Sequence, residues 1–204
     1  EVVMTRCACL VFALILAVPA MANIPFPDLC LLENAAGSDG AVLYVVPDGS
    51  GNTFDQASLG GDTTDATLTL TVNNNVGNPI ANYPAEDMWL VSTGGGFVPC
   101  DFAHPDAATD ANGQTQWLQS PFGGGNSLTE DAQAFIAGDP VPGPVPVHFV
   151  SSDINGDLEI DLLDISLFTP ALTNYDPVAD YDANGIVNLL DVSTMTQALG
   201  AICP

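Results

Sequence analysis

The sequence predicts a mostly β protein, with an antiparallel β-sandwich over residues 23–150 and a small helical module over residues 151–204. In the first part, short runs of β-branched and aromatic residues alternate with Gly-, Asn- and Asp-rich turns, which is typical of an antiparallel sandwich. In the second part, two similar acidic segments are each followed by apolar residues at helical spacing. We therefore expect two parts with different secondary structure.

Residues 1–22 have the features of a secretory signal peptide. Met4 fits a start, Arg6 supplies the positive charge, and an apolar run over residues 9–18 precedes small residues that end at Ala22. The apolar run is too short to span a membrane. We expect an exported protein, located outside the cell or at its surface, without membrane insertion.

The charge balance excludes several classes of partner. The chain has 25 acidic residues and one basic residue, Arg6, which a signal peptidase would remove. Nucleic acids and anionic membranes bind through Lys and Arg, so neither is an expected partner. A surface this acidic repels itself, so compact folding or association should depend on cations.

Six segments have the composition of sandwich strands, and "ATLTLTV" alternates strictly between apolar and polar residues. Asn112-Gly113 fits a tight hairpin turn. The six segments are residues 41–46, 66–72, 87–91, 114–119, 132–136 and 145–150.

The segment "TLTVNNNVGNPIANYPAEDMWLV", followed by "TDANGQTQW", resembles bacterial immunoglobulin-like domains. The resemblance covers residues 63–120 and implies an immunoglobulin-like sandwich that serves as a structural or spacer module.

Three cysteines follow the predicted signal peptide: Cys30, Cys100 and Cys203. In an oxidising compartment an odd number leaves one thiol unpaired or available to another chain. We expect Cys30 to pair with Cys100, because both belong to the sandwich. Three buried thiols are the alternative.

The two acidic segments, "DINGDLEIDLLD" from Asp153 and "DYDANGIVNLLD" from Asp180, fit calcium loops. An EF-hand-type loop binds Ca²⁺ through oxygens at positions 1, 3, 5, 7, 9 and 12, with a backbone carbonyl at position 7. We expect one ion per loop, two in all. The predicted ligands are Asp153, Asn155, Asp157, the Glu159 carbonyl, Asp161 and Asp164 in the first loop, and Asp180, Asp182, Asn184, the Ile186 carbonyl, Asn188 and Asp191 in the second.

The loops differ at position 6, where the sharp turn favours glycine. The second loop has Gly185, and the first has Leu158. A non-glycine residue at positive φ is uncommon, so we expect the first loop to be distorted or weaker.

Aspartate at position 12, the duplication, and one predicted helix after each loop (161–168 and 188–200) together resemble dockerin modules over residues 151–204. The resemblance implies calcium in each loop and association with a partner domain called cohesin. It places the partner contacts at Leu162, Leu163, Leu189 and Leu190. We expect one leucine of each pair to pack inside the module.

We expect the protein to have no enzymatic activity. Glu86-Asp87 and Glu130-Asp131 are adjacent pairs that would point to opposite faces of a strand, and no GxSxG, Cys–His or zinc spacing occurs. The expected function is calcium-dependent assembly with other copies of the chain or with a cohesin-like domain, as an extracellular fibre or surface layer. The alternative is a carbohydrate-binding module on a cohesin scaffold, with a polysaccharide as partner. Trp89 and Trp117 are its candidate sugar platform, although the sandwich core is the more expected place for both.

Overall fold

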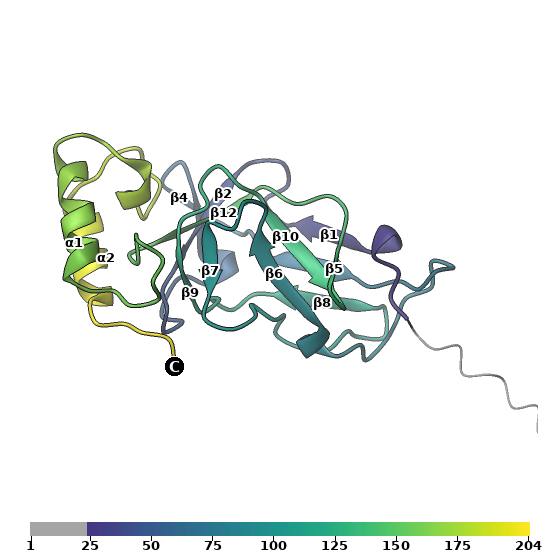
Figure 1. Cartoon of the computed structure of the whole chain (residues 1–204). Helices are drawn as coiled ribbons and strands as arrows, with labels where there is room; N and C mark the ends of the chain where they lie inside the picture. Colours follow the sequence, from purple (N-terminus) through teal and green to yellow (C-terminus); the bar gives the residue numbers. More distant parts are fainter. Residues whose placement is uncertain (1–23) are drawn as a thin grey trace, which may run out of the picture.

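The computed structural model of the protein describes residues 24–204 and consists mostly of β-structure (Figure 1). The predicted signal peptide, residues 1–22, lies outside the described residues. Within residues 24–204, no helix has both the length and the apolarity needed to cross a membrane.

The strands of the described chain are β1 (Leu31–Asn34), β2 (Ala41–Val45), β3 (Ala57–Leu59), β4 (Asp62–Thr64), β5 (Leu68–Thr71), β6 (Met88–Ser92), β7 (Phe97–Pro99), β8 (Gln114–Trp117), β9 (Gly123–Gly125), β10 (Ala132–Ile136), β11 (Asp139–Pro140) and β12 (Val147–Ser151). The α-helices are α1 (Leu162–Phe168) and α2 (Leu189–Ala198). Short 3-10 helices are η1 (Pro27–Leu29), η2 (Phe54–Gln56), η3 (Ala85–Asp87), η4 (Thr169–Leu172) and η5 (Pro177–Ala179). Each of the six predicted strand segments overlaps a strand, and a helix forms within each of the two predicted helical segments.

The strands form sheets with the orders β1-β5-β8, β11-β10-β6, β12-β2-β3-β4 and β7-β9. One pairing departs from the predicted antiparallel arrangement, because β12 runs parallel to β2. Four of the five residues in each of these two strands are buried. Burial on both faces is the environment in which parallel strands occur, so another part of the chain must cover the outer face of this pair.

The core consists of two apolar clusters, and β2 and β12 contribute to both. Alternate residues of a strand point to opposite faces. Leu43 and Phe149 belong to the large cluster of residues 24–150, the part predicted to be a sandwich and called the sandwich below, whereas Tyr44 and Val150 belong to the second cluster. The rest of the second cluster comes from Val46 and from the C-terminal part: Ile160, Phe168, Ala171, Ala179, Tyr181, Met195, Ala198 and Ala201. The helical part, at one end of the molecule in Figure 1, therefore covers the outer face of β2 and β12.

The predicted Cys30–Cys100 disulfide is wrong. Cys100, which follows β7, bonds Cys203, 103 positions later, and Cys30 is a buried free thiol. The Cys30 thiol instead donates to the carbonyl oxygens of Phe26 (3.4 Å) and Asn73 (3.7 Å). The C-terminus returns to the sandwich (Figure 1), so the cysteine most distant in sequence lies next to Cys100.

Candidate metal centres in the two acidic loops

The two loops have the same backbone conformation at their turns. In each, the residues at positions 4 and 6 are left-handed: Gly156 (φ 73°) and Leu158 (φ 71°) in the first loop, Ala183 (φ 52°) and Gly185 (φ 86°) in the second. Each loop thus combines one glycine with one residue that pays a steric penalty in this region. The expected distortion of the first loop at Leu158 is absent from the backbone, because Leu158 adopts the conformation of Gly185.

The aspartate at position 1 organises the turn in each loop. The Asp153 carboxylate accepts hydrogen bonds from the backbone N–H groups of Gly156 and Leu158, both at 2.8 Å. The Asp180 carboxylate likewise accepts one from Gly185 N–H, at 2.8 Å. These bonds turn both carboxylates inward, so each loop is wrapped around its first residue.

The aspartate at position 12 joins the start of each loop to the helix that follows. Asp164 accepts from the N–H of Ile154, at 2.9 Å, and Asp191 accepts from the N–H of Tyr181, at 2.8 Å. Each also closes a capping box with the N-cap residue of its helix, which is loop position 9. The short side chain at position 12 therefore accepts hydrogen bonds both from the start of the loop and from the N-cap residue of the helix.

The four residues at positions 1 and 12 are the buried charged side chains of the described chain: Asp153, Asp164, Asp180 and Asp191, each at most 2% exposed. A buried carboxylate is costly unless a cation or several donors compensate it. The sequence after residue 22 contains no Lys or Arg to do so. Burial raises the pKa of Asp153, and it also raises the pKa of Asp182 in the second loop.

The second loop brings three carboxylates together. One oxygen from each of Asp180, Asp182 and Asp191 lies within 4.8 Å of the others. In the first loop, Asn155 occupies position 3, so a neutral amide replaces one of these carboxylates. Carboxylate and amide oxygens are the ligands that Ca²⁺ prefers, so the donor chemistry of both loops fits calcium.

The remaining predicted ligands lie at the loop surface or at the helix starts. The side-chain amide of Asn155 donates to Asp157 (2.8 Å), and that of Asn184 donates to Asp182 (2.8 Å). Position 9 forms the helix caps: Asp161 accepts from Leu163 N–H (2.6 Å), and Asn188 accepts from Leu190 N–H (2.8 Å). Position 7 is exposed in both loops, at Glu159 and Ile186.

All four candidate docking leucines are exposed, by 75% for Leu162, 51% for Leu163, 83% for Leu189 and 64% for Leu190. The expectation that one leucine of each pair packs inside is therefore wrong. The leucines occupy the first two positions of α1 and α2, whereas the inward face of each helix begins at the buried position-12 aspartate and continues to Phe168 or Met195.

The sandwich contacts both loops through glycines. A Cβ at Gly124 in β9 would overlap the Asp153 carboxylate, and a Cβ at Gly61 would crowd Asn184. Gly125 N–H also donates to the Asp153 carbonyl at 2.9 Å. These close approaches seat the loops against the sandwich, and composition alone gave no sign of them.

Two tyrosines line the boundary between the sandwich and the helical part. The Tyr44 hydroxyl hydrogen-bonds the Ser152 hydroxyl at 2.8 Å, and the Tyr44 ring lies 5.3 Å from that of Tyr181. Burial raises the pKa of Tyr44 to about 12, and it also raises the pKa of Tyr181. Both tyrosines are therefore buried where the two parts meet.

The two tryptophans, the candidate sugar platform, differ in burial. Trp117 is buried and donates from Nε1 to the Ala103 carbonyl at 2.8 Å. Trp89 is half-buried, and the centre of its ring lies 5.1 Å from that of the exposed Phe102 and 5.6 Å from that of Phe135. A cavity of about 420 Å³ lies near the disulfide, and sequence reasoning did not find it. Its lining includes the exposed rings of Phe102 and Phe122 together with Trp117, His104, Asp106 and Gln119.

No protein-family model matches this chain, and no curated protein matches it either.

Proposed function

We propose that this chain is an exported, non-enzymatic calcium-binding protein that assembles through its helical part. Each acidic loop would bind one Ca²⁺ through the ligands given above. The exposed leucines at the start of α1 and α2 would then contact another copy of the chain or a separate cohesin-like domain. The sandwich would form the body of the resulting fibre or surface layer.

One observation carries the calcium proposal. The buried carboxylates of the described chain occupy positions 1 and 12 of two loops that share one backbone conformation. The sequence after residue 22 has no Lys or Arg that could neutralise them. A hard divalent cation is the partner whose ligand preferences match this oxygen-rich arrangement.

The lack of basic residues also limits how copies can associate. Salt bridges between copies would need Lys or Arg, so apolar contacts, strand addition at a sheet edge or shared cations must supply the attraction. A duplicated pair of exposed leucines is an apolar patch of the kind that marks an interaction surface. Two bound ions would change the formal charge of the whole chain only from −24 to −20, so we expect assembly to need further cations.

Calorimetric titration of the chelator-treated full chain tests the calcium proposal. We expect two Ca²⁺ per chain, with weak competition from Mg²⁺, which demands a stricter octahedral geometry. A titration that shows no calcium binding would reject the proposal. A stoichiometry of one would reject the proposal that each loop binds an ion.

Light scattering with and without millimolar calcium tests assembly. Leu163→Asp combined with Leu190→Asp should abolish calcium-dependent association and leave calcium affinity nearly unchanged. The chain offers a matched control in Leu31→Asp combined with Val76→Asp. These sandwich residues are 51% and 63% exposed, against 51% and 64% for Leu163 and Leu190. If the control variant loses association and the loop variant keeps it, the contacts lie on the sandwich. Strict monomers of wild-type protein in calcium would leave only a separate partner domain.

Carbohydrate binding is the second candidate, and the cavity of about 420 Å³ is the observation that favours it. Its exposed rings, Phe102 and Phe122, with the polar Asp106 and Gln119, combine stacking and hydrogen-bonding groups. A pull-down with insoluble polysaccharides, comparing wild-type protein with Phe102→Ala, tests this candidate. Equal retention of the two proteins would reject the cavity as a sugar site.

A further inference from the structure

The C-terminal tail, residues 200–203, runs along the first acidic loop. Backbone contacts join the tail to loop positions 6, 7 and 8: Ile160 N–H to the Ala201 carbonyl (2.9 Å), Gly200 N–H to the Ile160 carbonyl (2.8 Å), Cys203 N–H to the Leu158 carbonyl (3.4 Å), and a β-bridge between Glu159 and Ile202. The loop and the tail are therefore one hydrogen-bonded unit.

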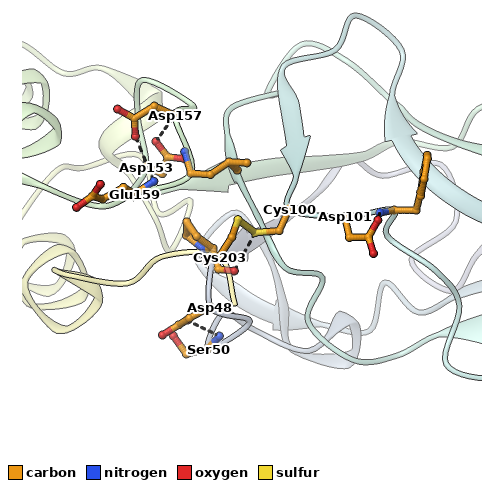
Figure 2. The surroundings of a disulfide bond; sticks show 11 residues. Asp48, Ser50, Cys100, Asp101, Asp153, Asp157, Glu159 and Cys203 are labelled. Atoms are coloured by element: carbon orange, nitrogen blue, oxygen red, sulfur yellow. Dashed lines mark hydrogen bonds between the residues drawn. A yellow bond between two sulfur atoms is a disulfide. The ribbon is translucent and has the colours of Figure 1, made fainter.

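The tail is in turn fixed to the sandwich by the Cys100–Cys203 disulfide. Figure 2 shows Cys203 bonded to Cys100, with the first-loop residues Asp153 and Glu159 in the same surroundings. On its other side the loop rests on β9, where Gly125 N–H donates to the Asp153 carbonyl at 2.9 Å. The first loop is thus held between the sandwich and a tail that is covalently attached to the same sandwich.

The segment that the tail holds contains the strained residue of the loop. Leu158 has φ 71°, a region in which a non-glycine residue is unfavourable. The next residue, Glu159, supplies the backbone carbonyl at position 7, and its orientation depends on the turn at position 6. Without external support, Leu158 would tend to leave the left-handed region and carry the Glu159 carbonyl with it.

The second loop has neither the strain at this position nor the support. Its position 6 is Gly185, which tolerates φ 86° without a steric penalty. Within residues 24–204, no backbone hydrogen bond or β-bridge joins positions 6 to 8 of this loop, residues 185–187, to the tail. The two loops therefore differ in what keeps the turn in place.

We propose that the Cys100–Cys203 disulfide is a positioning element for the first calcium loop, so that calcium binding there depends on oxidation while binding at the second loop does not. The inference rests on the proposed calcium function. Reduction by a dithiol transfers two electrons and two protons, breaks the bond between the two sulfurs, and leaves two cysteine thiols and the oxidised dithiol. The tail is then held only by noncovalent contacts, its hydrogen bonds and the packing of Ala201 in the second cluster, and Leu158 can relax.

The test uses the full chain with one loop disabled at a time. Asp182→Ala leaves the first loop intact, and Asp157→Ala leaves the second intact. Calcium affinity is measured by calorimetry before and after reduction with dithiothreitol, and in the Cys100→Ser, Cys203→Ser double variant. We expect the first loop to weaken about tenfold, which corresponds to about 1.4 kcal/mol and lies within the cost of a left-handed non-glycine residue. The second loop should change by less than about twofold.

Leu158→Gly separates positioning from a general loss of structure. Glycine removes the strain, so calcium affinity at the first loop of Leu158→Gly should become nearly independent of the disulfide. Equal weakening of both loops on reduction, or no weakening at the first, would overturn the inference. Persistent disulfide dependence in Leu158→Gly would do the same.

A kinetic measurement on calcium-loaded protein keeps the test valid if the reduced, calcium-free protein unfolds. Oxidised, calcium-loaded protein is reduced and then mixed with a chromophoric chelator, and faster release is expected from the first loop only. Equal release rates from both loops would contradict the inference. If neither single-loop variant binds calcium while oxidised, the calcium function itself is wrong. Calcium binding that does not change on reduction is a different result and contradicts only the role of the disulfide.

Discussion

Calcium removal should unfold the helical part before the sandwich. A ligand that binds only the folded state adds about 2.7 kcal/mol per site at a hundredfold excess over Kd, so two sites add about 5 kcal/mol. Small domains have only about 5–15 kcal/mol in total. The second cluster consists mainly of residues after residue 150, whereas the sandwich cluster contains none of them. Chelation should therefore act first on the second cluster.

Thermal unfolding with two probes measures this effect. Trp89 and Trp117 both lie in the sandwich, and the α-helices of the described chain both lie after residue 160. Tryptophan fluorescence thus reports on the sandwich, and helical circular dichroism reports on the C-terminal part. Chelator should lower the helical transition by at least roughly 20 °C, since 1 kcal/mol shifts Tm by about 4–8 °C in a small domain that unfolds separately.

Two outcomes would refute this reasoning. One is a helical transition that does not move in chelator. The other is a tryptophan transition that moves as far as the helical one, which would make the two parts a single cooperative unit. Asp139→Asn is the control, because it removes an exposed acid of β11 far from both loops in sequence and should leave the calcium-dependent shift unchanged.

Three further predictions concern single residues of the sandwich. Gly124→Ala should weaken calcium binding at the first loop and lower stability, because the added Cβ overlaps the Asp153 carboxylate; calorimetry and thermal unfolding measure both effects. Hydrogen bonding from the Ser92 hydroxyl lowers the pKa of Glu130, so its stabilising effect is present above the unfolded-state pKa and is lost as pH falls through the folded-state pKa. Glu130→Gln should therefore destabilise the protein at neutral pH, and the difference from wild type should disappear in acid; unfolding curves over a pH series would show whether it does. Cys30 is buried, and burial raises the pKa of its thiol, so an alkylating reagent should label Cys30 only after denaturation, as mass spectrometry of labelled peptides can establish.

Periodicity predicted the strands that have a strong side-chain pattern and missed those without one. Strictly alternating segments such as the one containing β5 are readable because one face is buried and the other is polar. β9 consists of three glycines, Gly123–Gly125, and glycine carries no such signal. These glycines are needed because Phe97 and Asp153 approach the strand closely, and that requirement becomes visible only in three dimensions.

The loop ligands could be proposed from spacing, but their environment could not. The fixed positions of an EF-hand-type loop identify candidate oxygens residue by residue. The disulfide prediction failed because it used proximity in sequence, whereas Cys203 reaches Cys100 through the return of the tail along the first loop. The leucine prediction failed because both leucines of each pair precede the inward-facing turn of the helix.

The packing of the helical part on β2 links the calcium state to the surface of the sandwich. The C-terminal part buries Tyr44, Val46 and Val150. If chelator unfolds that part, the apolar outer face of the parallel pair β2 and β12 becomes exposed. Exposed apolar surface promotes association of its own. Calcium-free protein could therefore also associate, through a different surface from that of the calcium-loaded protein. The two modes respond differently to Leu163→Asp with Leu190→Asp, because these side chains belong to the calcium-loaded docking surface and not to the face that chelation uncovers. If the double variant loses association in calcium but still associates in chelator, the leucine surface is the functional contact.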